Sequence, residues 1–212
     1  MAESVISQPA KKKRTAPLLA CGIFAWLAVL GWCLLRLQNY SLAAGDIDPA
    51  PARWPEKSTV GFVEGRPNLL VFVHPQCPCS RATLEELERI VANAREPLSA
   101  RVVFYSPAGQ PREWLHGDLW NAASKIPCVE LVEDVDGREG ERFGARTSGE
   151  ALLFDPSRHL VFSGGITRSR GHAGSSPGGD AILEHLSKQS AASATPVFGC
   201  PLCDTQCRKD MP

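Results

Sequence analysis

Two cysteines separated by a single residue give the clearest chemical signal in this 212-residue sequence. Cys77 and Cys79, the CxC pair, follow an apolar, β-branched run at residues 69–73. They precede residues 80–94, in which apolar side chains recur every three or four positions. These patterns predict a buried strand, a turn and an amphipathic helix. Because a helix N-terminus favours the thiolate form of a nearby cysteine, this unit predicts a reactive thiol site.

A second group of cysteines stands near the end of the chain, at Cys200, Cys203 and Cys207. Three cysteines do not complete a tetrahedral zinc site without a fourth ligand from elsewhere. One interpretation is a second dithiol that exchanges with the CxC pair, since the eleven residues that follow Lys188 can extend roughly 35 Å. The other is a structural disulfide that joins Cys200 to Cys203 or Cys207. The sequence leaves both open.

Composition narrows the class of protein. Lys and Arg number 23 and Asp and Glu number 23, so nothing in the charge favours a nucleic-acid partner. Two of the eight cysteines, Cys21 and Cys33, fall in an apolar N-terminal stretch, which leaves six others. An even number of cysteines fits an oxidising compartment but does not determine their pairing.

The N-terminus predicts a membrane anchor. A basic cluster at residues 11–14 is followed by residues 15–35 without any charged side chain, about the length of a bilayer-spanning helix. The basic cluster should stay in the cytoplasm, so the rest of the chain crosses the membrane. A cleaved signal peptide is the alternative, because residues 41–44 resemble a cleavage site. We expect a single-pass protein of the cell inner membrane with its soluble domain in the periplasm.

The expected organisation has five parts: a cytoplasmic basic N-terminus (1–16), a transmembrane anchor (17–36), a linker (37–58), a folded domain (59–189) and a Cys-containing tail (190–212). In the folded domain the sequence predicts strands at 101–105 and 128–132, a helical stretch within 111–124, a hairpin of 151–154 with 160–162, and a helix at 180–188. Residues 133–137 predict a turn in preference to a calcium loop. Cys128 is expected to be a small buried apolar residue. Strands that alternate with helices predict an α/β domain, a three-layer α/β/α sandwich.

The element order and the cysteine position resemble the thioredoxin-like superfamily over about residues 60–188, particularly its membrane-anchored, exported members. The stretches CPCSRATL and SGGITRSRGH are similar to the RedB group of bacterial membrane-anchored proteins. The resemblance implies a thiol–disulfide oxidoreductase that needs no cofactor and acts on thiol- or disulfide-containing protein substrates. It also implies that Cys77 is the nucleophile and Cys79 the resolving thiol.

The sequence departs from the thioredoxin pattern at four places. Ser80 stands at the second cysteine position of the usual CxxC turn, and Gln76 replaces the aromatic residue before the first cysteine. Residues 146–150 lack the usual proline, and residues 69–73 contain no acid. A disulfide across one intervening residue closes a small, strained ring, which makes it easier to reduce.

Basic residues are expected around the site. In the thioredoxin-like topology, residues 163–172 reach the rim of the cysteine turn, which would place Arg168, Arg170 and His172 there to lower a thiol pKa or bind an anion. His74 is close enough in sequence to reach Cys77. The alternative is that these side chains are solvated loop residues.

Two other functions remain open at this point. Two thiolates and one imidazole suit copper, so the CxC pair and His172 could serve a thioredoxin-fold copper metallochaperone. The domain could also be a non-catalytic binding module.

Overall fold

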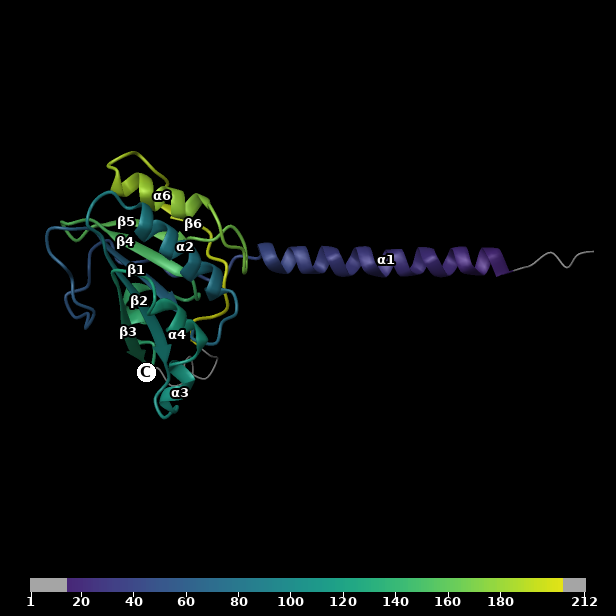
Figure 1. Cartoon of the computed structure of the whole chain (residues 1–212), viewed down its shortest axis with the longest axis horizontal. Coiled ribbons are helices and arrows are strands. Elements are labelled where there is room, and N and C mark those ends of the chain that lie inside the picture. The colour runs from purple at the N-terminus through teal and green to yellow at the C-terminus, as the bar shows by residue number, and fades with distance from the viewer. Residues whose placement is uncertain (1–14, 204–212) are drawn as a thin grey trace, which may run out of the picture. The chain divides into compact units, whose positions relative to one another are not determined.

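The computed structural model describes residues 15–203, so Cys207 lies outside the described residues. The chain forms two units, one that ends at Tyr40 and one that begins at Ser41. Helix α1 (Thr15–Leu42) contains the segment Leu19–Leu42, which is apolar (mean hydropathy 1.9) and has no buried share (Figure 1). By length and composition this segment can cross a membrane, as an anchor or as a signal sequence. The helix continues beyond residue 36, where we expected the anchor to end.

The second unit is built on one mixed six-stranded sheet, in the order β3-β2-β1-β4-β5-β6. Strands β1, β2 and β3 are parallel, β4 is antiparallel to β1 and to β5, and β6 is parallel to β5. Their bounds are Asn68–Val73 (β1), Ser99–Ser106 (β2), Val129–Val135 (β3), Glu150–Phe154 (β4), Leu160–Gly165 (β5) and Ala194–Thr195 (β6). This thioredoxin-like α/β fold confirms the predicted fold class.

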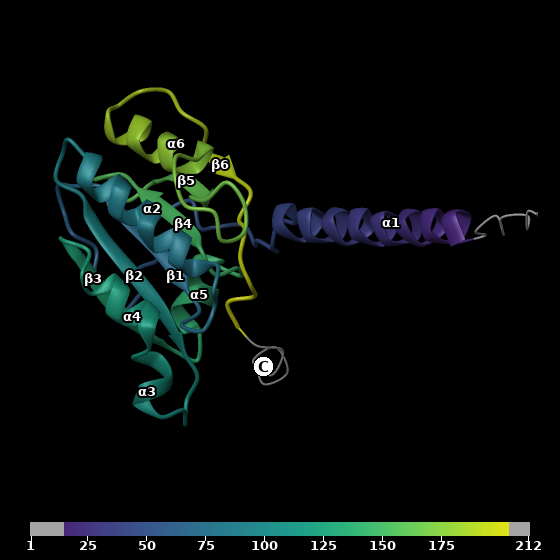
Figure 2. The ribbon, with the colours of Figure 1, turned by 45° about the vertical axis from the view of Figure 1, so that its right-hand side comes forward.

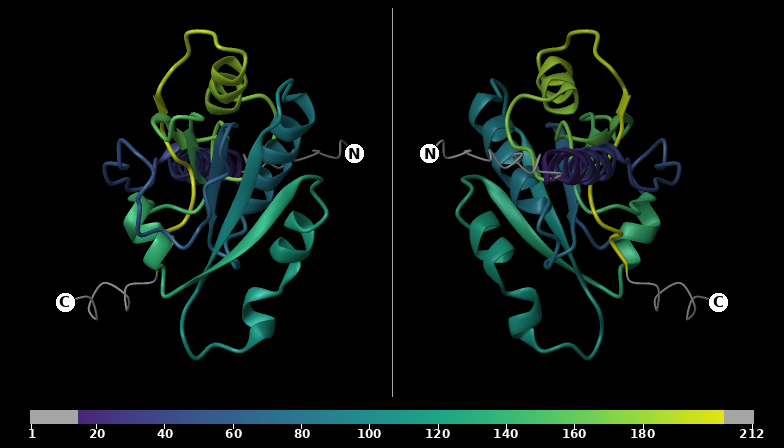
Figure 3. Two further views of the ribbon diagram at one scale, coloured as in Figure 1. Left: turned by 90° about the vertical axis from the view of Figure 1, so that its left-hand side faces the viewer. Right: turned by 90° about the vertical axis from the view of Figure 1, so that its right-hand side faces the viewer.

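Five shorter helices cover the sheet: α2 (Ser80–Asn93), α3 (Arg112–Leu115), α4 (Asp118–Ala123), α5 (Arg138–Phe143) and α6 (Pro177–Leu186). Alternate residues of β1 point to opposite faces. Leu69 and Val71 pack with α2, α4 and α6, whereas Leu70 and Phe72 pack with α5. Figure 2 shows α2 running along the sheet, and Figure 3 separates α2 and α4 from α5.

Residues 133–135 of the predicted turn belong to β3, and the turn at residues 136–137 leads into a helix that we did not predict. Asp136 and Gly137 have φ angles of 60° and 70°, as a tight turn requires. The Asp134 carboxylate then accepts the backbone N–H groups of Glu139 and Gly140, both at 2.8 Å, which stabilises the first turn of α5. Helix α5 spans only six residues and includes a glycine, so its sequence has no clear helical period.

Segments that we expected to be a linker and a tail contribute to the core. Trp54 is 5% exposed and makes edge contacts with the rings of Phe62, Phe143 and Phe154, each at a centroid distance of 5.1 Å. Leu202, from the tail, is buried in the same cluster. Both flanking segments therefore help the short helix α5 to cover this face of the sheet.

The prediction for Cys128 is wrong. Its side chain is exposed and its φ angle is 60°. Cys128 lies in the connection between α4 and β3, one residue before the strand begins at Val129, so it does not share the burial of the sheet.

Candidate active site

The CxC pair lies in the connection between β1 and α2, as predicted. Two successive turns shape this connection, since the Cys77 N–H donates to the His74 carbonyl (3.0 Å) and the Ser80 N–H donates to the Cys77 carbonyl (3.1 Å). Cys79 is the N-cap residue of α2, and its side chain makes no capping hydrogen bond. Cys77 is 2% exposed and Cys79 is half-buried. The cysteines therefore stand at the end of a helix that favours negative charge.

A chain of hydrogen bonds leads from the backbone to the Cys77 sulfur. The His74 N–H donates to the Ser148 hydroxyl (2.8 Å), which lies 2.7 Å from the Ser80 hydroxyl. The Ser80 side chain in turn hydrogen-bonds to Cys77. If Ser148 donates to Ser80, every hydroxyl proton in the chain points towards the Cys77 thiolate. Sequence reasoning named Ser80 but missed Ser148, whose only signal was its place in residues 146–150, the segment without a proline.

The tail runs antiparallel to the loop that contains Ser148. The Ser148 N–H donates to the Cys200 carbonyl, and the Leu202 N–H donates to the Arg146 carbonyl, both at 2.8 Å. The chains approach so closely at Gly199 that a Cβ atom there would lie 1.8 Å from the Ser148 carbonyl oxygen. We call residues 199–202 the tail strand. Its backbone, and not a disulfide, holds it beside the CxC pair.

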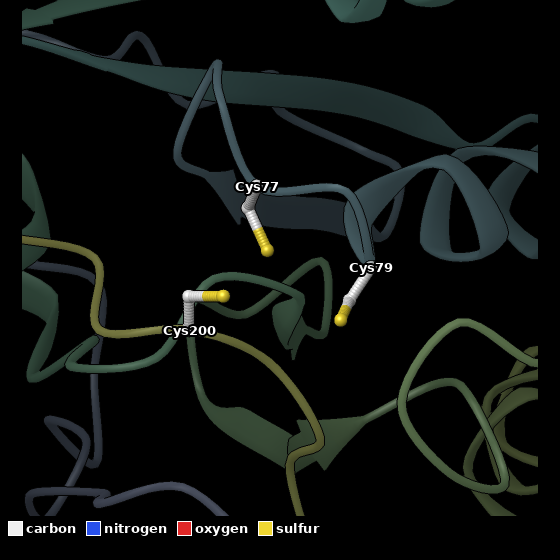
Figure 4. A group of neighbouring side chains, drawn as sticks. All are labelled: Cys77, Cys79 and Cys200. Carbon is white, nitrogen blue, oxygen red and sulfur yellow. The ribbon is translucent and has the colours of Figure 1, made fainter. Parts of the chain in front are cut away.

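This pairing brings a third sulfur to the site. The Sγ atoms of Cys77, Cys79 and Cys200 all lie within 4.8 Å of one another, and all three residues are free thiols. In Figure 4 the side chains of Cys77 and Cys200 point towards one another, and Cys79 reaches the same space from the start of α2. The structure thus brings one tail cysteine, Cys200, to the CxC pair. The Cys203 thiol donates to the Tyr105 hydroxyl (3.8 Å).

The three thiols have different proton affinities. Burial raises the pKa of Cys77, but hydrogen bonds from Ser80, from the backbone and thiol of Cys200, and from the Cys79 backbone outweigh it, so the net pKa is lowered. Burial and the neighbouring Cys77 charge raise the pKa of Cys79. Burial, followed by the hydrogen bond and charge of Cys77, raises the pKa of Cys200 to about 12. Cys77 is therefore the thiol of this cluster whose pKa is lowered, whereas the pKa values of its two neighbours are raised.

Of the predicted basic rim, Arg170 is the residue beside the sulfurs. Its guanidinium donates to the Gly199 carbonyl, and its charge acts to lower the pKa of both Cys79 and Cys200. Its backbone N–H donates to the Ser41 carbonyl (3.0 Å). Arg170 therefore ties the tail strand to the sulfur cluster by charge and by hydrogen bonding.

The other two rim residues point elsewhere. Arg168 is exposed and donates to the Ser175 carbonyl (3.0 Å). His172 is exposed, and its Nδ1 atom pairs with the Ser169 hydroxyl (2.8 Å). His172 is therefore not part of the group of metal-ligand atoms among the described residues, where Cys200 takes the third place.

A cavity of about 600 Å³ adjoins Cys77. His74 lines it, as do Arg170, Cys200 and Cys203. The imidazole of His74 stacks on the Tyr105 ring at a centroid distance of 5.6 Å. A partner that reaches Cys77 through this cavity would therefore meet the tail cysteines on the way.

A buried acid lies near the site after all, on β4 and not on β1. Glu150 pairs with Phe72 of β1 across the sheet and is 0% exposed. One carboxylate oxygen accepts the Arg146 N–H at 3.1 Å. Burial raises the pKa of Glu150 to about 7. The loop that holds the tail strand thus hydrogen-bonds to a carboxyl group whose pKa lies near neutral pH.

Comparison with known proteins agrees with this architecture at the level of the fold. No family model and no curated protein matches the chain. An uncharacterized conserved protein from Geobacillus kaustophilus superposes with a TM-score of 0.54 at 16% identity, over 76% of this chain and 92% of that one. A hypothetical protein from Sinorhizobium meliloti gives a TM-score of 0.51 at 18% identity, over 66% and 80% of the two chains. A secreted disulfide oxidoreductase from Mycobacterium tuberculosis gives 0.40 at 15% identity, over 59% and 83%.

The hydrogen-bond chain predicts the effect of Ser80→Ala. Loss of a hydrogen bond worth about 1 kcal/mol should shift the pH midpoint of Cys77 alkylation upward by roughly one pH unit. Iodoacetamide labelling followed by mass spectrometry measures this midpoint. Ser124→Ala is the matched control, since the Ser124 hydroxyl donates to the Asn121 carbonyl instead. An unchanged midpoint in Ser80→Ala would remove Ser80 from the mechanism.

Glu150 predicts a pH-dependent stability. Its folded pKa of about 7 lies above the ordinary value of 4.5 for a glutamate, so the stability gained from the protonated carboxyl is lost as pH rises through about 7. Between about pH 5 and pH 8, the free energy of unfolding of the wild type should fall by roughly 2 kcal/mol more than that of Glu150→Gln. Urea denaturation followed by circular dichroism measures the difference. The exposed Glu88→Gln should behave as the wild type, and parallel curves for Glu150→Gln would contradict the prediction.

Proposed function

We propose that this protein is a membrane-anchored thiol–disulfide oxidoreductase of the extracytoplasmic space that acts on thiol- or disulfide-containing proteins. The observation that best supports the proposal is the environment of Cys77. Hydrogen bonds from Ser80 and Cys200 lower its pKa despite burial, and a thiolate is the reactive form of cysteine.

In the proposed reaction, the Cys77 thiolate attacks one sulfur of a partner disulfide. The partner S–S bond breaks, a mixed disulfide forms on Cys77, and the other partner sulfur leaves and takes up a proton. Cys79 then loses its proton and attacks the Cys77 sulfur, which releases the second partner thiol and leaves a Cys77–Cys79 disulfide. Arg170 favours this step because its charge stabilises the Cys79 thiolate. The reverse sequence would oxidise a partner dithiol.

The proposed location follows from the N-terminal sequence. The basic cluster at residues 11–14 precedes the apolar segment Leu19–Leu42. Its positive charge should keep residues 11–14 on the cytoplasmic side, which would place the sulfur cluster in the periplasm. The sequence similarity to the RedB group supports the same arrangement, with the apolar helix retained as an anchor.

Cysteine variants test the reaction. Cys77→Ser should abolish turnover of a disulfide substrate, because the nucleophile is lost, and Cys79→Ser should slow resolution so that mixed disulfides accumulate. Turnover is measured with a model disulfide substrate, and mixed disulfides are measured by non-reducing mass spectrometry. Cys128→Ser removes an exposed thiol outside the site and should leave both unchanged. Full activity of Cys77→Ser would overturn Cys77 as the nucleophile, whereas no turnover by the wild type would leave a non-catalytic binding module as the better function.

The three close sulfurs also favour a second candidate, transport of copper. Three thiolates form a soft ligand set for Cu(I), and the sulfur atoms of Cys77, Cys79 and Cys200 lie within 4.8 Å of one another. The set differs from the one that the sequence suggested, since Cys200 stands in place of His172. When bound there, Cu(I) would be cargo held by these thiolates.

Copper titration separates this candidate from thiol exchange alone. One Cu(I) should bind per chain, and Cys200→Ser should weaken binding by roughly tenfold or more, since even changes around a metal ligand cost that much. Competition with a coloured Cu(I) chelator measures the affinity. His172→Ala should bind as the wild type does. If binding is absent, or does not depend on the three cysteines, the copper function is excluded.

A further inference from the structure

Backbone hydrogen bonds of the fold hold Cys200 in its position. Its carbonyl accepts the Ser148 N–H (2.8 Å), and the Leu202 N–H two residues later pairs with Arg146 (2.8 Å). Leu202 itself is 3% exposed, so the tail strand is anchored in the core beyond Cys200. Further back, the Val197 carbonyl accepts the Gly45 N–H (2.8 Å). Hydrogen bonds on both sides therefore hold the Cys200 sulfur near Cys77.

The geometry within the CxC pair is less favourable for a stable disulfide. One residue separates Cys77 from Cys79, so their disulfide closes a small, strained ring. No such ring constrains a disulfide between Cys77 and Cys200, which belong to different segments. Because the fold already holds these two residues together, closing their disulfide costs little further chain entropy.

We infer that Cys200 is a third redox thiol, which takes the disulfide over from the CxC pair so that Cys77–Cys200 is the resting oxidised form. This inference rests on the proposed thiol-exchange function and adds a residue and a step to it. It also gives the tail strand a role in the reaction.

The step balances without a further oxidant. The partner disulfide has already accepted two electrons when Cys77–Cys79 forms. The Cys200 thiolate then attacks the Cys77 sulfur, the Cys77–Cys79 bond breaks, the Cys77–Cys200 bond forms, and Cys79 leaves as a thiolate that takes up the proton lost by Cys200.

The position of Cys200 fits this order of events. In the reduced protein, Cys200 is hydrogen-bonded to Cys77. Once Cys77 is part of a disulfide, the backbone pairing of the tail strand still holds Cys200 beside the Cys77 sulfur that it attacks.

Disulfide mapping of the full-length protein tests the inference. The purified chain is oxidised with excess oxidised glutathione, its remaining thiols are alkylated, and trypsin releases residues 58–81 with the CxC pair and residues 189–208 with the tail cysteines. We expect these two peptides to be cross-linked in the wild type and in Cys128→Ser. The cross-link should be lost in Cys200→Ser, whose oxidised form should carry Cys77–Cys79 instead.

A second variant keeps every thiol but displaces the tail strand. In Gly199→Ala the added Cβ would lie 1.8 Å from the Ser148 carbonyl oxygen, so the pairing that positions Cys200 should be lost. We expect loss of most of the cross-linked peptide at the same glutathione concentration.

The outcomes separate this inference from the proposed function. An internal Cys77–Cys79 disulfide in the wild type, with Cys200 alkylated, would overturn the role of Cys200 and leave thiol exchange intact. A cross-link that persists in Cys200→Ser would assign the step to another tail cysteine and would also overturn the inference. Failure of the oxidoreductase function would show in a different result, no turnover of the model disulfide substrate by the wild type.

Discussion

A buried thiolate is stable only when hydrogen bonds replace the water that it has lost, and the site depends on this constraint. Cys77 is 2% exposed and yet has a lowered pKa. The donors come from three separate parts of the chain: the start of α2 (Ser80), the loop before β4 (Ser148, through Ser80) and the tail strand (Cys200). Stabilising one negative sulfur therefore requires that these parts pack together, which links the reactivity of the site to the fold.

The contacts of Ser148 give a physical reason why the loop before β4 has no proline. Ser148 occupies the loop, and its N–H binds the tail strand while its hydroxyl supports Ser80. Proline has neither an N–H nor a hydroxyl, so it could make neither hydrogen bond. Among the described residues no peptide bond is cis. Both hydrogen bonds of Ser148 therefore depend on a residue other than proline at this position.

Charge is distributed unevenly around the cluster. One thiol with a lowered pKa, two thiols with raised pKa values and the Arg170 guanidinium lie within one small region, and the Glu150 carboxyl, with a pKa of about 7, is buried beneath the loop that holds the tail. From the sequence alone, Cys79 was the expected resolving thiol and the tail cysteines were candidates for exchange or for a structural disulfide. The structure differentiates them, because Cys79 belongs to the helix end and Cys200 to the tail strand.

The α/β class, the strand–CxC–helix unit and the apolar N-terminal helix were predictable from the sequence, because they depend on local hydrophobic periodicity and helix-terminus chemistry. The sequence did not show α5, the exposure of Cys128, or the roles of Trp54 and Leu202 in the core. The folded structure was needed to show that Cys200, and not His172, joins the CxC pair, and that Ser148 and Glu150 lie nearby. Those relations arise from backbone pairing between segments that are far apart in the chain, and such pairing leaves no periodic signal in the sequence.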